Sequence, residues 1–403
     1  MKPPPPAHAP HLVILGKNVL TQPFGAGHVR FGPYQAVARR CRRVDLVFVS
    51  EHADGHEEVV GNVHVHAGPP RGGWRGHVAY VRHAWRVLTA LERGAPPDIY
   101  WVEDPLTAGV LTWWAHLRLG VPWVVAVRAD YLHLNKVRWS WLSRALQAGL
   151  TRLLTRRATR VRVVARHMRG DLEACGVEAA RIVVLPSPTD LSRFEPGRAA
   201  AAAADLRASW GWPAEACILV FMGTFTTTKG LDLLLDALAR VRVESPLLRL
   251  VLVGDGPERE AVEAQVNRLG LGDVVRLTGQ VGHDEVPLAL AAADGLVLSS
   301  RDEGVPRCAV EAAAMARPLV ITAVGGCPET VVNEVSGYLV PPTVGGLASG
   351  LRRIAALTPP ERAELGRRGR EHILAGGFEA EANNERAYRD LLLAPWREQP
   401  RRR

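Results

Sequence analysis

Two glutamates, Glu303 and Glu311, lie on either side of a Gly-Val-Pro turn in the segment RDEGVPRCAVEAAAMARP (301–318). The alanine-rich run after the turn predicts a helix, with Glu303 at its start and Glu311 one turn inside it. The N-terminal end of a helix carries partial positive charge and free N–H groups, which favour an anionic ligand. The two carboxylates beside it are suited to accept hydrogen bonds from hydroxyl groups of the same ligand.

Four glycine-rich turns in the second half of the chain each follow an expected strand and precede an expected helix. They are MGTFTTTKG (222–230), VGDGPERE (253–260), SSRDEGVPRC (299–308) and VGGCPETV (324–331). Glycine lets backbone N–H groups approach a ligand closely, and Lys229 adds a full positive charge suited to a diphosphate. The carboxylate of Glu311 is suited to accept two hydrogen bonds from the vicinal diol of a ribose. The carboxylate of Glu303 is suited to accept hydrogen bonds from the hydroxyl groups of a sugar. The four turns together predict a nucleotide diphosphate sugar as the ligand.

Several of these residues also have a purely structural interpretation. A lysine at a turn is commonly solvated, and Glu311 on an alanine-rich helix can be a surface residue. Glu103 and Asp104, at the end of an expected strand, are suited either to contact an acceptor or to cap the next helix. The capping role is preferred, with Pro105 at an early position in that helix.

Valine-rich apolar runs recur along the chain with helix-like stretches between them, a pattern typical of buried parallel strands. In the first half they lie at 12–16, 44–50, 98–103, 122–130, 161–165 and 181–186. In the second half they lie at 216–223, 248–254, 274–279, 295–300 and 318–322, and a helix is expected at 231–241. Ligands bind beyond the carboxyl ends of the strands in such sheets, which is where the four turns lie.

The length of 403 residues suggests two domains of similar size, because a single core rarely grows that large. A polar linker after residues 186–188 separates the two series of strands. We therefore predict an α/β fold of two doubly wound, Rossmann-like domains that face each other across a cleft. The predicted domains are 1–190 and 191–377, and residues 378–403 are predicted to form a helix that packs back on the first domain, followed by a basic tail.

The composition is typical of a globular protein, with 47% apolar and 23% charged residues. No apolar run reaches the ~18 residues that would span a bilayer. The start, MKPPPPAHAP, lacks the apolar core of a secretion signal. The five cysteines, at 41, 175, 217, 308 and 327, show neither metal-ligand spacing nor a disulfide framework. We therefore expect a cytoplasmic protein without a metal site.

The net charge of +9 is concentrated in one segment. Between residues 131 and 170 there are ten Lys or Arg and no Asp or Glu. Two tryptophans, Trp139 and Trp141, and leucines at 142, 146, 150, 153 and 154 give this segment a basic amphipathic pattern, which can lie on an anionic membrane surface. The alternative is a helix with its leucines in the core. We expect salt-sensitive association of 136–162 with the cytoplasmic face of the membrane, and no nucleic-acid partner because no recognition motif is present.

These motifs resemble those of the GT-B glycosyltransferases of family 4, most densely from 219 to 342. Glu303 and Glu311 match the E-x7-E motif of that family, and Gly223 with Lys229 matches its glycine-rich turn and lysine. In the first half, QPFGAGHVR (22–30) occupies the place of a paired-glycine loop that faces the donor phosphates. The resemblance implies a retaining glycosyltransferase whose first domain binds the acceptor and whose second domain binds the nucleotide sugar.

The resemblance also implies roles for individual residues. Lys229 would bind the donor diphosphate, Glu311 the ribose and Glu303 the transferred sugar, and Lys229, Glu303 and Arg128 are the implied catalytic residues. The implied donor-binding residues are Gly25, Gly27, Gly223, Thr224, Lys229, Gly254, Gly256, Val281, Glu303, Gly304, Val305, Pro306 and Glu311. No cofactor is expected beyond the nucleotide sugar, and no metal.

The expected reaction transfers a hexosyl group to a glycan, glycolipid or small-molecule acceptor, in cell-envelope or exopolysaccharide biosynthesis. Three sites depart from the usual family pattern: Thr224 stands where an arginine is usual, Arg128 where a histidine is usual, and Ser187-Pro188 where asparagine-glycine is usual. The alternatives are a sugar-nucleotide epimerase or hydrolase with the same architecture, which would need no acceptor, and a catalytically weak homologue that only binds sugar nucleotides.

Overall fold

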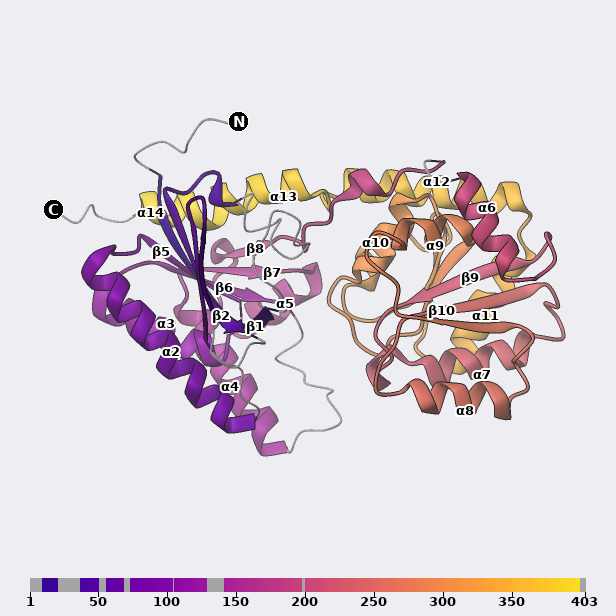
Figure 1. Cartoon of the computed structure of the whole chain (residues 1–403), viewed down its shortest axis with the longest axis horizontal. Coiled ribbons are helices and arrows are strands. Elements are labelled where there is room, and N and C mark those ends of the chain that lie inside the picture. The colour runs from indigo at the N-terminus through magenta and orange to yellow at the C-terminus, as the bar shows by residue number, and fades with distance from the viewer. Residues whose placement is uncertain are drawn as a thin grey trace. The chain divides into compact units, whose positions relative to one another are not determined.

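The computed structural model describes residues 9–20, 37–50, 56–68, 73–103, 105–128, 141–197 and 200–398. The chain forms two compact units (Figure 1). The first comprises residues 1–188 together with 381–403, and the second comprises residues 189–380. These limits differ by a few residues from those predicted from the sequence.

The described strands of the first unit form one sheet in the order β3-β4-β2-β1-β5-β6-β7-β8. Neighbouring strands are parallel, except that β3 runs antiparallel to β4. The strand order reverses between β1 and β5, so the carboxyl ends of these two strands flank a topological switch point. The strands are β1(His11–Leu20), β2(Arg43–Ser50), β3(His56–Val60), β4(Val63–Gly68), β5(Ile99–Val102), β6(Trp123–Val127), β7(Arg160–Val163) and β8(Ile182–Val184).

Helices cover both faces of this sheet. On one face α2 contacts β2 and β4, α3 contacts β1, β5 and β6, and α4 packs against α3. On the other face the C-terminal residues Leu391 and Leu392 join a buried cluster with Leu12 and Trp101 of the sheet. The helical segments are α2(Gly73–Gly94), α3(Thr107–Leu119), α4(Trp141–Arg157), α5(Arg166–Ala174), η1(Ala179–Arg181), α13(Ala380–Arg386), η5(Ala387–Leu393) and α14(Ala394–Arg397).

The C-terminal segment is held on the first unit by charge as well as by apolar packing. Arg160 Nη2 of β7 lies 2.8 Å from Glu398 Oε1, and Arg40 pairs with Glu385. The two ends of the first unit are therefore joined although the whole second unit lies between them in the sequence.

The second unit is a doubly wound sheet in which all neighbouring strands are parallel, in the order β11-β10-β9-β12-β13-β14. Helices α7, α8 and α11 cover one face, and α6, α9, α10 and α12 cover the other (Figure 1). The strands are β9(Cys217–Met222), β10(Leu248–Val253), β11(Val275–Gly279), β12(Gly295–Leu298), β13(Leu319–Thr322) and β14(Gly337–Val340). The helices are η2(Leu191–Arg193), α6(Ala200–Ser209), η3(Thr227–Lys229), α7(Leu231–Val241), α8(Arg259–Arg268), α9(Val286–Ala292), α10(Arg307–Ala314), η4(Cys327–Glu329), α11(Val344–Ala356) and α12(Pro359–Ala375).

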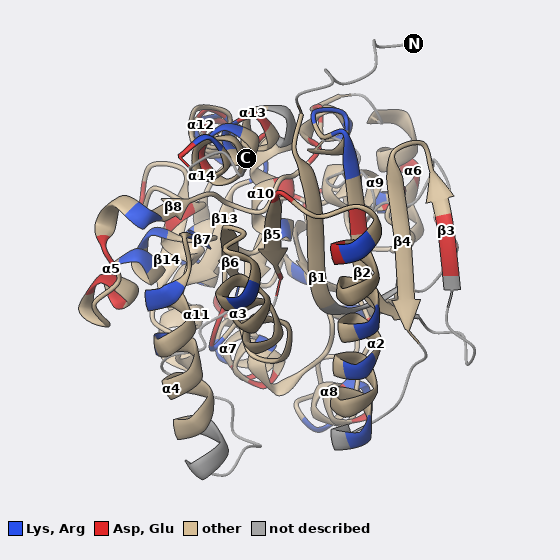
Figure 2. Cartoon of the chain, turned by 90° about the vertical axis from the view of Figure 1, so that its left-hand side faces the viewer, with Lys and Arg blue, Asp and Glu red and all other residues tan. Residues whose placement is uncertain are grey.

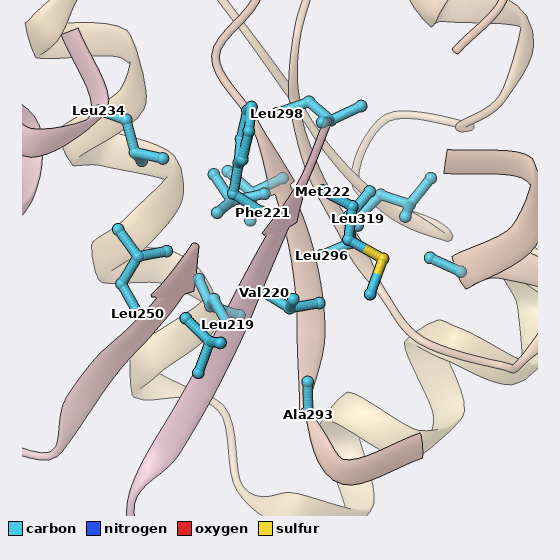
Figure 3. Packing of buried hydrophobic residues seen from close by; sticks show 14 of the residues in the cluster. Leu219, Val220, Phe221, Met222, Leu234, Leu250, Ala293, Leu296, Leu298 and Leu319 are labelled. Carbon is cyan, nitrogen blue, oxygen red and sulfur yellow. The ribbon is translucent and has the colours of Figure 1, made fainter. Parts of the chain in front are cut away.

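The core of the second unit lies around its central strand β9. Every residue of this strand is buried, so its sequence CILVFM shows no alternation of apolar and polar residues. Side chains from β9, β10, β12 and β13 meet there, together with Leu234 of α7 (Figure 3). This continuous packing on both faces fixes the strand ends that carry the glycine-rich turns.

The sequence did not predict strands β3, β4 and β14. The first two form a hairpin at the edge of their sheet, and their residues HEEVV and VHVHAG mix apolar side chains with His and Glu. Burial in β4 alternates along most of the strand because the outer part of the sheet is only partly covered. Strand β14, with the sequence GYLV, lies at the edge of its sheet and contains only one valine. Helix α7 has the bounds predicted for it.

Helix α4 does not bury its leucines as a group. Leu154 is buried, but Leu146 is 64% exposed and Leu153 is also exposed. The core side of the helix instead carries threonines such as Thr155, whose hydroxyl donates to the carbonyl of Thr151 at 2.7 Å and so needs no external partner. The prediction that the leucines lie in the core is therefore wrong for Leu146 and Leu153. In the part of the chain that the structure describes, no helix is both long and apolar enough to cross a membrane.

Candidate active site

The carboxyl ends of parallel strands place the predicted site residues of the second unit at one edge of its sheet. The turn after β9 carries Gly223 and Thr224 and ends in η3, which contains Lys229. The turn after β10 carries Gly254 and Gly256, and Val281 follows β11. The turn after β12 contains Glu303, Gly304 and Val305 and leads through Pro306, the N-cap, into α10.

Lys229 and Glu303 form an ion pair across this edge, with Lys229 Nζ 2.5 Å from Glu303 Oε1. The hydroxyl of Ser300 donates to the same carboxylate oxygen at 2.7 Å. Burial opposes the charge on Lys229, but the adjacent carboxylate outweighs this effect, so the pKa of the Lys229 ammonium lies above its ordinary value. The site therefore holds a fixed, half-buried cation beside an oriented carboxylate.

Glu311 occupies the second turn of α10, where its residue is only 5% exposed. Burial raises the pKa of its carboxyl group to about 7, although the positive charges of Arg307 and Arg193 act in the opposite direction. Among the described residues, none donates a hydrogen bond to this carboxylate. A buried carboxylate without donors costs free energy, which a ligand with a pair of hydroxyl groups would recover. The alternative of an exposed helix-surface glutamate is thus wrong.

Two glycines after β13 fix the backbone that carries Glu303. The amide of Gly326 donates to the carbonyl of Gly304 at 2.7 Å and to that of Glu303 at 3.2 Å. A Cβ atom on Gly325 would lie 1.8 Å from the Glu303 carbonyl oxygen, and one on Gly326 would lie 2.1 Å from the Gly304 carbonyl oxygen. The turn 324–331, predicted as a ligand loop, supports the Glu303 loop from beneath.

The turns after β9 and β10 also touch backbone to backbone. A Cβ atom on Gly254 would lie 2.0 Å from the carbonyl oxygen of Gly223, and one on Gly256 would lie 2.5 Å from that of Phe225. The amide of Phe225 donates to the carbonyl of Asp255 at 2.8 Å. These glycines therefore hold two turns together, and Thr224 between them is exposed to solvent.

Arg128 belongs to the first unit, where it follows β6. Its Nη1 lies 2.5 Å from Oε2 of Glu103, which follows β5 and has a side chain that is only 4% exposed. The predicted capping role of Glu103 is wrong, because the N-cap of α3 is Leu106. The pair lies at the carboxyl ends of the strands, beside the switch point between β1 and β5, where ligands of such sheets bind. Gly25 and Gly27 lie outside the described residues.

Comparison with known proteins assigns the chain to a family. Residues 203–372 match the family described as Glycosyl transferases group 1, and residues 25–188 match the Glycosyl transferase 4-like domain. A 2-deoxystreptamine glucosyltransferase of Streptomyces kanamyceticus is 31% identical over 305 residues, which are 73% of this chain and 77% of that protein. The chain belongs to the group 1 glycosyl transferases.

Solved structures confirm the predicted GT-B fold of this group 1 glycosyl transferase. A sucrose-phosphate synthase of Thermosynechococcus elongatus superposes with a TM-score of 0.78 at 24% identity, covering 96% of this chain and all of that one (100%). HepE of Anabaena, in complex with UDP and glucose, superposes with a TM-score of 0.72 at 22% identity, covering 95% of this chain and 99% of that one.

Other curated relatives match the group 1 glycosyl transferase over a shorter span. The D-inositol 3-phosphate glycosyltransferase of Saccharomonospora viridis is 37% identical over 219 residues, which are 52% of this chain and 48% of that protein. The chain thus spans about half the length of this relative and of similar ones.

Several site residues of this group 1 glycosyl transferase escaped prediction. Ser300 shares the carboxylate of Glu303 with Lys229, Arg193 acts on Glu311 from outside the glycine-rich turns, and Glu103 pairs with Arg128. The signal for Ser300 and Glu103 was their place at the carboxyl end of a strand, two residues after β12 and directly after β5. Arg193 gave no signal, because it lies far from Glu311 in the sequence. Among the described residues, no group of His, Cys, Asp and Glu is arranged to hold a metal ion.

Proposed function

We propose that the protein is a retaining glycosyltransferase that moves a hexosyl group from a nucleotide diphosphate sugar to a glycan, glycolipid or small-molecule acceptor. The observation that carries this proposal is the grouping, at one sheet edge, of the Lys229–Glu303 pair with the buried, donor-free carboxylate of Glu311. Family membership supports it, as do the UDP and glucose bound to HepE and the names of the glucosyltransferase and synthase relatives.

In this proposal each charged side chain of the site interacts with one group of the donor. Lys229 and the free N–H groups at the start of α10 stabilise the diphosphate as it leaves with the electron pair of the broken bond. Glu311 accepts hydrogen bonds from the ribose hydroxyls, and Glu303 accepts from the transferred sugar. The acceptor hydroxyl attacks from the face that the diphosphate leaves, and a phosphate oxygen takes its proton, so the configuration at the sugar carbon is retained.

Lys229 supplies the positive charge that the leaving diphosphate needs, so we propose a reaction without a metal ion or other cofactor. In the first unit, Arg128 would add a second cation, held in orientation by Glu103. Thr224 lies exposed at the donor edge and adds no charge there. A cation from another position therefore has to replace the arginine that is usual at the position of Thr224 in this family.

The place of action is proposed to be the cytoplasmic face of a membrane, with an acceptor that belongs to a cell-envelope glycan or an exopolysaccharide. The support is the basic segment 136–162, which carries no Asp or Glu. A lipid-linked or anionic acceptor, or the membrane surface itself, would offset its positive charge.

Replacing Glu303 and Glu311 separately by alanine tests the assignment. We expect each variant to lose donor turnover by about a hundredfold or more, the scale of losing one preorganised electrostatic contact in a transition state. The assay incubates the protein with a panel of nucleotide sugars and follows slow donor hydrolysis, so that no acceptor has to be known. Near-normal turnover in both variants would refute the assignment.

The same panel separates this reaction from those of the alternative enzymes. Conversion of a free nucleotide sugar into its epimer, with no acceptor present, would identify an epimerase. Binding of nucleotide sugars without any turnover, with or without acceptors, would identify a binding homologue. A transferase instead shows hydrolysis that is slow alone and is overtaken by transfer when a suitable acceptor is added.

A further inference from the structure

Large apolar side chains are exposed on the outward side of α2, α3 and α4, three neighbouring helices of the first unit. Single exposed apolar residues are ordinary, but a group of them on helices that contact one another calls for a partner. We name it the α2–α4 face. Its exposed apolar residues are Val78, Val81 and Trp85 on α2, Val110, Trp114 and Leu117 on α3, and Leu146 and Leu153 on α4.

Two tryptophans join α2 and α3 at the surface. The ring centroids of Trp85 and Trp114 lie 4.1 Å apart, yet the residues remain 37% and 41% exposed. The core side of α2 is already filled by other residues, such as Tyr80 and Leu88, which are buried. Trp85 and Trp114 therefore add little to the core, and tryptophan is a residue that favours the boundary between apolar and aqueous surroundings.

The same three helices are strongly basic. They carry one carboxylate, Glu92, whose Oε2 lies 3.7 Å from Arg118 Nη2. Figure 2 shows Lys and Arg in blue along α2. Against this single negative charge stand the arginines of the three helices, which are Arg75, Arg82, Arg86, Arg93, Arg118, Arg144, Arg152, Arg156 and Arg157.

Helix α4 continues the surface. It turns Leu146 and Leu153 outward and keeps threonines inside, so apolar side chains lie among its exposed arginines. An ordinary surface helix would have the reverse arrangement, with leucines toward the core. The outward leucines thus extend the apolar surface of α2 and α3 into the basic segment.

The chemistry of the α2–α4 face favours one partner. A second copy of the chain would bring two like-charged surfaces together, which is unfavourable. A nucleic acid would use the arginines and stack bases on the tryptophans, but it would leave the exposed valines and leucines without apolar partners. An anionic bilayer satisfies all three groups, because arginines bind its headgroups, tryptophans sit at their level and aliphatic side chains reach the acyl boundary.

We propose that the α2–α4 face docks on an anionic lipid surface, with Trp85 and Trp114 at the level of the headgroups. The inference rests on the membrane association in the proposed function and extends the contact from the segment 136–162 to three helices. The lipid surface would hold the first unit, which is the expected acceptor-binding unit, at the place where a lipid-linked acceptor is exposed.

The first test is flotation with vesicles of phosphatidylcholine alone and of phosphatidylcholine with phosphatidylglycerol, at low and at high salt. We expect the wild-type protein to float only with the anionic vesicles and only at low salt. The Trp85→Ser/Trp114→Ser variant should lose about tenfold or more in vesicle affinity. The matched control, Val243→Ser/Leu374→Ser, removes exposed apolar side chains from the second unit and should float like the wild type.

A second pair of variants separates a local basic surface from overall charge. Arg82→Gln/Arg86→Gln and Arg240→Gln/Arg268→Gln remove the same number of exposed positive charges, from the α2–α4 face and from the second unit respectively. We expect the first variant to bind anionic vesicles about tenfold more weakly or worse, and the second to bind almost normally. Equal losses in both would show that net charge alone drives binding and would overturn the proposal.

Three further outcomes overturn the proposal. They are a wild-type protein that stays unbound at low salt, a tryptophan variant that floats normally, and sedimentation data in which that variant turns a dimer into a monomer without any vesicle binding.

Donor hydrolysis in solution should be unchanged in all four variants, because none of the substituted residues belongs to the candidate site. If hydrolysis is present and flotation fails, only the lipid-docking proposal is lost, whereas absent hydrolysis with normal flotation refutes only the transferase assignment.

Discussion

A single carboxylate oxygen of Glu303 accepts hydrogen bonds from both Lys229 and Ser300. The second oxygen is then the natural acceptor for a ligand hydroxyl, while the lysine keeps further N–H donors for a phosphate. Glu311 differs, because burial rather than an ion pair determines its state. Two carboxylates of the same type therefore lie in different surroundings: Glu303 is held by an ion pair, and Glu311 is buried without a hydrogen-bond donor among the described residues.

At the residue scale we predict that nucleotide affinity falls as the pH drops below about 7. The pKa of the Glu311 carboxyl is raised to about 7 by burial, and its ionised form is the one that accepts two hydroxyl hydrogen bonds. Below this pKa each binding event must release a proton, so affinity should fall by up to about tenfold for each pH unit. Calorimetric titration with UDP on both sides of neutral pH measures this slope.

The Glu311→Gln variant is the control for this titration. It keeps the shape of the side chain but cannot ionise, so its affinity should be lower at alkaline pH and should lack the contribution of Glu311 to the pH slope. The phosphates of UDP titrate in both experiments and cancel in the comparison. Identical slopes in the wild type and the variant would contradict the role of Glu311.

At the scale of the elements, the glycine-rich turns pack against one another, in addition to any contact with a ligand. Gly325 and Gly326 lie against the carbonyl groups of Glu303 and Gly304, and Gly254 lies against that of Gly223. Close backbone contact of this kind is open only to glycine, and it holds the Glu303 loop against the turn that follows β13. The turns are therefore as much a support for the site as a binding surface.

We predict that Gly326→Ala disturbs the site through its packing and not through backbone strain. The φ angle of Gly326 is −89°, which alanine adopts readily, but the new Cβ would collide with the Gly304 carbonyl oxygen. Overpacking of this kind costs about 1–3 kcal/mol and should displace Glu303, so donor turnover should fall together with the stability of the second unit. Thermal unfolding and the donor-hydrolysis assay report the two effects.

Gly345→Ala, in the first turn of α11, is the matched control. A Cβ atom there meets nothing within 4 Å, and alanine is the better helix former, so stability should be unchanged or rise by about 0.5–1 kcal/mol. If both variants behave alike, the packing of Gly326 under the Glu303 loop does not position the site.

At the scale of the whole molecule, the two units have separate cores, and the first contains a buried charge cluster that the second lacks in its described residues. Asp45 is fully buried in β2 and accepts hydrogen bonds from His11 at 2.6 Å, His66 at 2.8 Å and Arg43 at 2.7 Å. Burial alone would raise the pKa of Asp45, but these three donors hold it well below its usual range. The cluster joins β1, β2 and β4, and it lies near the amino ends of β1 and β2. Glu103 and Arg128, in contrast, follow the carboxyl ends of β5 and β6.

We predict that acid destabilises the first unit before the second. Burial lowers the pKa values of His64 and His83 in the first unit and, among the described residues of the second, that of His283. The unfolded chain therefore binds more protons, and both units, the first more than the second, lose stability as the pH falls through about 6.5, the ordinary pKa of histidine. The depressed pKa of Asp45 stabilises the fold above about pH 4, and this contribution is lost as the pH falls further. Amide hydrogen exchange at decreasing pH, comparing β1 and β2 with β9 and β10, resolves the two units.

The Asp45→Asn variant tests the cluster directly. It leaves buried cationic and polar donors without their carboxylate, which should cost the first unit about 3–5 kcal/mol and remove the part of its loss of exchange protection that occurs below about pH 4. Asp273→Asn, at an exposed ion pair of the second unit, should cost less than about 1 kcal/mol. Equal effects of the two substitutions would show that the cluster does not stabilise the fold.

Much of this architecture follows from local patterns in the sequence. Valine-rich runs of five to nine residues predict buried parallel strands because both faces of such strands are covered, and the runs in the second half correspond to β9 to β13. The spacing of Glu303 and Glu311 predicts one carboxylate in the turn before α10 and the other inside this helix, because helix geometry is local. The hairpin of β3 and β4 was missed, since its pattern depends on which side of an edge strand is covered.

Contacts between residues far apart in the sequence were decided only by the tertiary structure. Lys229 and Glu303 are 74 positions apart, and their ion pair exists because β9 and β12 are neighbours in the sheet. The sequence identified both residues but predicted that each binds a different group of one ligand, without a contact between them. Likewise, the leucine spacing of α4 predicts a helix, but whether Leu146 faces the core or the solvent depends on what packs against the helix. Local patterns determine which segments form helices and strands. Whether a side chain is buried or paired depends on the elements that lie next to it in space.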